Sequence, residues 1–154
     1  VKISEGLAIE TYLQTQFDEE DPNFSPDGGW IAYQSDASGR DEIYLGRYPP
    51  TARRWQVSNE GGTAPRWRAD GRELFYRNGA KLMVVDVQSG SEIVLGNPEQ
   101  LFEIPDGILA AHDVAPDGQG FVMIDSRDSM PPPRKIQIVQ NWFKELERLV
   151  PTNQ

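Results

Sequence analysis

Short apolar runs separated by turn-forming residues make up most of the chain. The runs over residues 29–35, 72–77 and 120–126 have strand length, and several are apolar on both alternating faces, which predicts strands in sheets buried on both sides. Together these runs predict an all-β protein. The predicted strands cover residues 9–15, 21–25, 29–35, 41–48, 52–58, 64–68, 72–77, 80–87, 92–103, 108–115, 120–126 and 134–140.

One pattern, a strand followed by Asp-Gly and a second strand, occurs three times. The three steps are Asp27-Gly28, Asp70-Gly71 and Asp117-Gly118, which lie 43 and 47 residues apart. Glycine accepts a positive φ and aspartate binds nearby backbone N–H groups, so these residues are predicted to form turns rather than to act as ligands or catalysts. A repeat of about 40–50 residues with several short strands is typical of β-propeller blades.

The repeat divides a single domain, residues 1–154, into three predicted four-stranded blades at about 21–62, 63–105 and 106–140. The last of these contains only three predicted strands, so the strand at 9–15 is expected to complete a blade, either in its own chain or in a second copy. Apolar residues at helical spacing over 141–150 predict a short C-terminal α-helix that covers a sheet edge; a membrane or partner helix is the alternative.

The first repeat, from Phe24 to Ser35, reads Phe-Ser-Pro-Asp-Gly-Gly-Trp-Ile-Ala-Tyr-Gln-Ser and is followed by Asp-Glu-Ile-Tyr at 41–44. These residues resemble the TolB-type, WD-repeat-like β-propeller family. The segment 141–146 resembles the end of the propeller sensor regions at the C-termini of some bacterial serine/threonine kinases. The chain departs from the family phrase at Arg68-Ala69 and at Ala115. The resemblance implies a propeller that docks a protein or peptide, with an extracytoplasmic or periplasmic location.

Three blades are fewer than the roughly 4–8 that a closed propeller contains. An open half-ring would expose an apolar blade face at each end, and such faces mark association. Two chains of three blades would give a six-bladed ring. We therefore expect a homodimer, since two-fold dimers are the commonest soluble oligomers.

Composition narrows the possible functions. The absence of cysteine excludes disulfides, thiolate metal sites and a cysteine nucleophile, and the net charge of −9 argues against nucleic-acid binding. No apolar run reaches the roughly 20 residues that span a bilayer, so no membrane insertion is expected. No cofactor or metal-binding motif occurs, and none is expected. The chain begins at Val1, and a processed product, a trimmed chain and a piece of a longer protein are all open as its origin.

Four residues are candidates for binding: His112, the only histidine, and Arg66, Trp67 and Arg68 in the arginine-rich middle of the chain. Arginine beside aromatic rings can hold an anion or a protein partner, or can pack blade against blade. Catalysis by His112 is disfavoured because Asp113, its neighbour on a strand, points to the opposite face. The sequence thus predicts a non-enzymatic binding scaffold; the alternative is a hydrolase with esterase, peptidase or glycosidase activity in a propeller channel.

Overall fold

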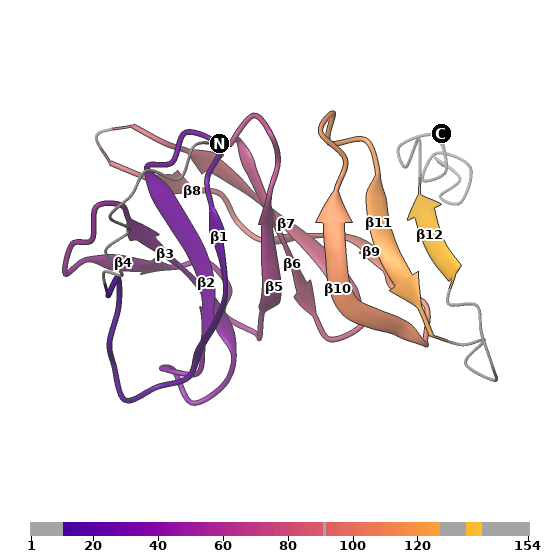
Figure 1. Cartoon of the computed structure of the whole chain (residues 1–154), viewed down its shortest axis with the longest axis horizontal. Helices are drawn as coiled ribbons and strands as arrows, with labels where there is room; N and C mark the ends of the chain where they lie inside the picture. Colours follow the sequence, from indigo (N-terminus) through magenta and orange to yellow (C-terminus); the bar gives the residue numbers. More distant parts are fainter. Residues whose placement is uncertain (1–10, 91, 127–134, 140–154) are drawn as a thin grey trace, which may run out of the picture.

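The structure, a computed structural model, describes residues 11–90, 92–126 and 135–139. This part of the chain is all-β, with no helix, and forms three antiparallel sheets that stand side by side (Figure 1). The strands are β1 (Glu19–Phe24), β2 (Trp30–Ser35), β3 (Glu42–Arg47), β4 (Arg54–Gln56), β5 (Thr63–Trp67), β6 (Glu73–Asn78), β7 (Lys81–Gln88), β8 (Val94–Leu95), β9 (Glu99–Glu103), β10 (Ile108–Val114), β11 (Phe121–Asp125) and β12 (Lys135–Val139).

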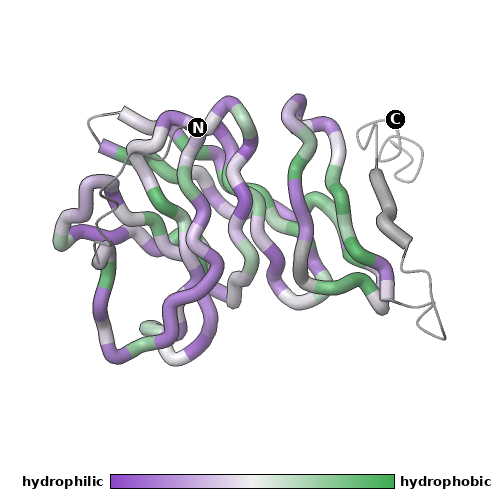
Figure 2. Tube along the Cα trace, in the orientation of Figure 1, coloured by the Kyte–Doolittle hydropathy of each residue, from purple (hydrophilic) through white to green (hydrophobic). Residues whose placement is uncertain are grey.

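The first sheet has the strand order β1-β2-β3-β4, so each strand pairs with its neighbour in sequence. Its centre is the hairpin of β2 and β3, in register from Trp30 opposite Arg47 to Ser35 opposite Glu42. Every residue of β2 is buried, which explains why both alternating faces of this strand are apolar. β1 is mostly exposed, and Figure 2 shows it as hydrophilic along most of its length.

The second sheet has the order β5-β6-β7-β8, and β9 also pairs with β7. The prediction of one strand over 92–103 is therefore wrong, and this sheet has five strands rather than four. The break falls at Gly96, whose backbone N–H donates to the Asp86 carbonyl at 2.9 Å. Pro98 follows and has no N–H to continue a ladder. The third sheet has the order β10-β11-β12 in the described residues.

Two apolar cores hold the sheets face to face. The core between the first and second sheets includes Trp30, Leu45, Leu74 and Val85, all buried. The core between the second and third sheets is built around Phe75, Leu82, Phe121 and Met123. Because successive side chains of a strand point to opposite faces, a middle sheet can contribute to both cores. The second sheet does so through Leu74 and Phe75.

Polar contacts add to these cores at the strands β1, β5 and β10, which lie next to one another. The Trp67 backbone N–H donates to Asn23 Oδ1 and its indole N–H donates to the Asn23 carbonyl, both at 3.2 Å. Arg77 reaches from the second sheet to the third, where its guanidinium donates to the Leu109 carbonyl at 2.6 Å. The arginine and tryptophan side chains of the middle of the chain thus join neighbouring sheets.

Two further sequence predictions concern the ends of the chain. The predicted strand at 9–15 is wrong for residues 11–15, which belong to no strand; residues 9 and 10 lie outside the described residues. The reason is that Tyr12 packs its ring against the face of the first sheet instead of pairing its backbone. The predicted helix at 141–150 lies outside the described residues. Within the described residues, no helix of the length and apolarity needed to cross a membrane occurs.

Candidate functional site on the rim of the sheets

The three Asp-Gly turns have the same geometry. Gly28, Gly71 and Gly118 have φ values of 69°, 72° and 70°. In each turn an aspartate Oδ1 accepts a hydrogen bond from the backbone N–H two residues later: 3.0 Å for Asp27, 3.0 Å for Asp70 and 2.9 Å for Asp117. These six residues therefore build tight connections between β1 and β2, between β5 and β6, and between β10 and β11.

The turns lie on the same side of the three sheets, at the top in Figure 1, and form a rim. Neighbouring turns are close to each other. A Cβ at Gly71 would lie 3.6 Å from Pro26 Cδ, and the Arg68 guanidinium donates to the Asp117 carbonyl at 3.5 Å. The Ser25 hydroxyl and the Gly29 N–H hold the pKa of Asp27 below its ordinary value, so this carboxylate is charged at neutral pH.

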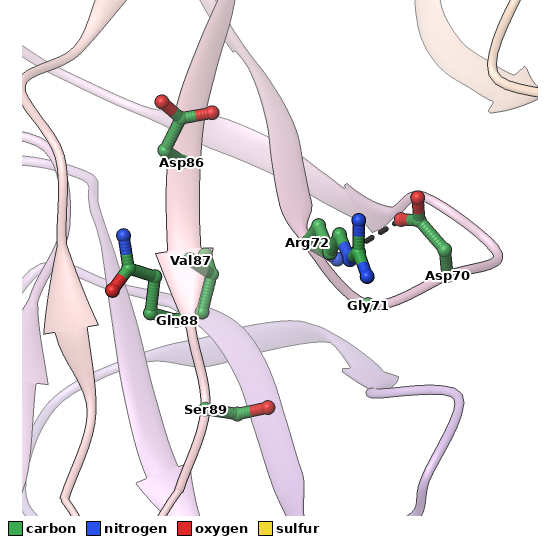
Figure 3. Close-up of a pocket in the computed structure, with 7 residues that line it drawn as sticks. All are labelled: Asp70, Gly71, Arg72, Asp86, Val87, Gln88 and Ser89. Carbon is green, nitrogen blue, oxygen red and sulfur yellow. Dashed lines mark hydrogen bonds between the residues drawn. The ribbon is translucent and has the colours of Figure 1, made fainter.

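A pocket of about 380 Å³ opens beside the second turn (Figure 3). The turn contributes one wall, and the end of β7 contributes the other. Seven residues line the pocket: Asp70, Gly71, Arg72, Asp86, Val87, Gln88 and Ser89. In Figure 3 the Asp86, Gln88 and Ser89 side chains come from one continuous stretch of chain; Ser89 points toward the side of the turn that carries Asp70 and Arg72, and Gln88 points to the opposite side of the strand.

A smaller hollow of about 50 Å³ shares Asp70, Gly71 and Ser89 with this pocket. It extends the site to Ser25 and Asp27 of the first turn. The combined site carries three carboxylates, one guanidinium, hydroxyl groups and an amide. Such a lining suits a polar ligand that offers hydrogen-bond donors or a positive charge, because carboxylate oxygens accept and ammonium or guanidinium groups donate.

Three of the predicted binding residues lie near this site, at the end of β5. Trp67 is buried and lines the smaller hollow. Arg68 is held by carboxylates, with its guanidinium 3.0 Å from Glu73 and 3.5 Å from Asp70. The Arg66 guanidinium donates to the Pro65 carbonyl at 2.7 Å. The Arg66 and Arg68 guanidinium groups are thus bound by carbonyl and carboxylate groups of this same chain.

His112 is separate from the rim pocket. It lies on β10 opposite Met123 and is only 5% exposed. Asp113 is exposed, and its carboxylate accepts a hydrogen bond from the Val114 N–H at 2.9 Å. The Ser126 hydroxyl donates to the Gly107 carbonyl at 2.6 Å. The Asp113 and Ser126 side chains thus bond to backbone groups. No group of three possible metal-binding side chains occurs in the described part of the chain.

Sequence reasoning missed Asp86, Gln88 and Ser89. They follow Asp70 by at least 16 residues and belong to no motif. They reach the turn because β7 pairs with β6 in a register that sets Asp86 opposite Glu73. In the sequence, the only signal for these three residues was that they lie at the end of a predicted strand that neighbours a predicted turn.

No protein-family model and no curated protein matches this chain. Solved structures do resemble it. An oligogalacturonate lyase from Vibrio parahaemolyticus is 21% identical over 70% of this chain and 29% of its own, with a TM-score of 0.53. A protein named as a putative TolB from Agrobacterium tumefaciens is 17% identical over 86% of this chain and 48% of its own, with a TM-score of 0.54. TolB from Acinetobacter baumannii is 18% identical over 86% of this chain and 43% of its own, with a TM-score of 0.48.

The chain has the fold of a partial, TolB-type β-propeller. In a propeller the sheets are blades, arranged face to face around an axis. β1, β5 and β10, which neighbour one another, are then the inner strands. The chain spans less than half the length of each of these three structures.

Proposed function

We propose that this chain is a non-enzymatic, propeller-type binding scaffold that works as a homodimer, two copies forming one six-bladed ring. The observation that carries the proposal is the apolar outer face of the third sheet. Val122 and Ile124 alternate with the buried Phe121 and Met123, and so point away from the second sheet. Their partners in the register of β11 with β12 are Ile138 and Ile136.

The first sheet supplies a matching face at the opposite end of the chain. Ile31, Tyr33 and Tyr44 form a cluster on the side that does not pack against the second sheet. Blade-against-blade packing is how propellers bury such faces. Contact between the third sheet of one copy and the first sheet of the other, made twice, would bury both faces in a closed two-fold ring.

The assembly prediction is a dimer in solution. Light scattering at micromolar concentration should give twice the chain mass of 17.3 kDa. Ile124→Lys should return the protein to the monomer, because it places a charge in the contact between copies. Val94→Lys is the matched control: Val94 is exposed on β8 of the second sheet, which forms neither end face, so this variant should remain dimeric. A compact wild-type monomer under these conditions would refute the assembly.

The rim pocket is the proposed ligand site of this scaffold, and its ligand a basic peptide. The charges of Asp27, Asp70 and Asp86 support this choice. On an array of peptides, purified protein should prefer sequences with exposed Lys or Arg. Asp86→Asn should weaken that binding roughly tenfold, the change expected from losing a charge-assisted hydrogen bond of about 1.4 kcal/mol. Asp106→Asn, which removes an exposed carboxylate away from the pocket, should bind like the wild type.

The enzymatic alternative is favoured by one observation, since a neighbour in structure is an oligogalacturonate lyase. A propeller active site on this chain would draw on inner-strand residues, and on β10 the titratable residues are His112 and Asp113. Ester, peptide and glycosidic substrates, including oligogalacturonate, tested on wild type and on His112→Ala would separate the two functions. Turnover that is lost in the variant would favour the enzyme.

The proposal extends to the context of the chain. It would be the sensor part of a larger bacterial protein, located outside the cytoplasm. The support is the sequence resemblance to propeller sensor regions and the short span of the chain relative to similar structures. The sequence of the intact gene tests this directly.

A further inference from the structure

Residues 11–18, here called the cap, lie along the outer face of the first sheet. The cap is the indigo segment leading into β1 at the left of Figure 1. It is fixed at both ends. The Tyr12 hydroxyl donates to the Arg47 carbonyl at 3.2 Å, and the Asp18 N–H donates to Asp36 Oδ1 at 3.0 Å. Arg47 ends β3 and Asp36 follows β2, so the cap runs the length of the sheet.

Tyr12 occupies a fitted position on this face. Its ring packs against the cluster of Ile31, Tyr33 and Tyr44. Burial raises the pKa of Tyr12 to about 12. Gly46 lies directly beneath its hydroxyl, so a Cβ at residue 46 would overlap the Tyr12 oxygen. The next atom of Tyr12, Cζ, would be 3.3 Å from that Cβ. A glycine at 46 therefore provides the space that the hydroxyl needs.

The cap does not fill the face. A groove of about 400 Å³ remains between Thr11, Tyr12 and Leu13 of the cap and Ile31 and Tyr33 of the sheet. Leu13 and Phe24 are exposed apolar side chains at this end of the molecule. A loosely packed strap over an apolar cluster has fewer contacts to lose than a sheet in a close-packed core.

We propose that the cap and the third sheet of a second copy compete for the same face, so that the cap regulates assembly of the ring. This inference rests on the proposed homodimer. When the cap is bound to the first sheet, Tyr12 covers the cluster of Ile31, Tyr33 and Tyr44. The third sheet of the other copy would contact this same cluster. Assembly requires both copies to release their caps. Any change that unseats Tyr12 then favours the dimer.

Substitutions at two positions unseat the cap by different means. Tyr12→Ala removes the ring, and Gly46→Ala expels it by overlap with the hydroxyl while adding a methyl group to the face. Each should tighten the dimer about a hundredfold, because two caps are released per dimer and losing the hydrogen bond and buried ring of each cap is expected to contribute about tenfold. The double variant Tyr12→Phe/Gly46→Ala removes the overlapping oxygen and should bring the dissociation constant back toward the wild-type value, short of full recovery because the hydrogen bond to the Arg47 carbonyl is lost. Gly90→Ala, where a Cβ has ordinary contacts, is the control.

Sedimentation over a range of concentrations measures these constants, and a spin label reports the cap itself. The chain has no cysteine, so Thr11→Cys gives a single site for a nitroxide on the exposed start of the cap. The label should be restrained in the monomer and mobile in the dimer. The inference is overturned if the dimer forms with an unchanged constant in both uncapped variants, or with the label as restrained as in the monomer. Absence of a dimer in every variant would instead overturn the proposed assembly.

Discussion

Phe121→Ala is expected to destabilise the protein by about 3–5 kcal/mol, the range for removing a large aromatic side chain from a close-packed core. Phe121 on β11 is 1% exposed. Its ring meets those of Phe75 and Phe102 edge to face, with centroids 5.1 and 5.8 Å away. The substitution therefore leaves a cavity in the core that holds the third sheet to the second.

In this variant the third sheet should unfold locally before the rest of the protein unfolds. Besides this core, polar contacts of Arg77 and Arg68 attach the third sheet to the second. Amide exchange should therefore increase first in β10 and β11, while β2 and β3 stay protected. Urea unfolding gives the total change in free energy, and exchange measured by mass spectrometry gives its location.

Phe24→Ala is the matched control for this prediction. Phe24 is 54% exposed on β1 and contacts the ring of Tyr48. Its truncation should cost less than about 1 kcal/mol, because little buried surface is lost. Equal losses in the two variants would mean that Phe121 does not hold a core between the sheets.

The repeat made the sheets predictable from sequence. Strand, Asp-Gly and strand is a local signal, since the φ of Gly28 and the N–H bound by Asp27 lie within the turn itself. The apolar residues on both faces of β2 and β3 are also a local signal: one face packs against the second sheet and the other against Tyr12. The all-β class and the propeller likeness followed from these two signals.

Contacts between distant segments were not predictable in this way. The alternation at residues 11–15 resembles that of a strand, but here Tyr12 packs against the first sheet while Thr11 and Leu13 are exposed at the groove beside it. Periodicity reports which side of a segment is buried, and does not distinguish pairing from docking. The rim pocket required the register of β6 with β7, which no pattern in the sequence specifies.

A buried carboxylate fastens the linker between the first and second sheets. Glu42 at the start of β3 is 1% exposed. Its Oε1 accepts from the Arg40 Nε at 2.7 Å and from the Gly61 N–H at 3.0 Å, and its Oε2 accepts from the Ser58 hydroxyl. Ser58 Oγ in turn accepts from the Ile43 N–H at 2.7 Å. One side chain thus satisfies donors from the β2–β3 turn and from the linker that leads to β5.

The negative charge of Glu42 also acts on the core beside it. Burial raises the pKa of Tyr76 to about 12, and the charges of Glu42 and Glu60 add to the rise. Tyr76 is buried in the core between the first and second sheets. Its neutral form is favoured by folding, so its share of the stability is present below pH 10 and is lost as the pH rises toward 12.

Glu42→Ala is expected to cost about 2–4 kcal/mol, because the Ser58 hydroxyl and the Gly61 N–H lose their acceptor, while the charged partner Arg40 is exposed. The Ser58 hydroxyl and the Gly61 N–H would then lie inside the protein without their acceptor. Glu42→Gln keeps one carbonyl acceptor and should cost less, about 1–3 kcal/mol. Asp41→Ala is the control. Asp41 adjoins Glu42, but its side chain is exposed, so its removal should change stability by no more than about 0.5 kcal/mol.

Urea denaturation of the four proteins measures these differences. Because Glu42 ties the linker to β3, the variants should also loosen the connection before β5, and proteolysis near residues 58–62 should accelerate in Glu42→Ala but not in Asp41→Ala. If Glu42→Ala unfolds at the same urea concentration as Asp41→Ala, the linker is held by the apolar core alone, and the buried carboxylate contributes nothing to joining the two sheets.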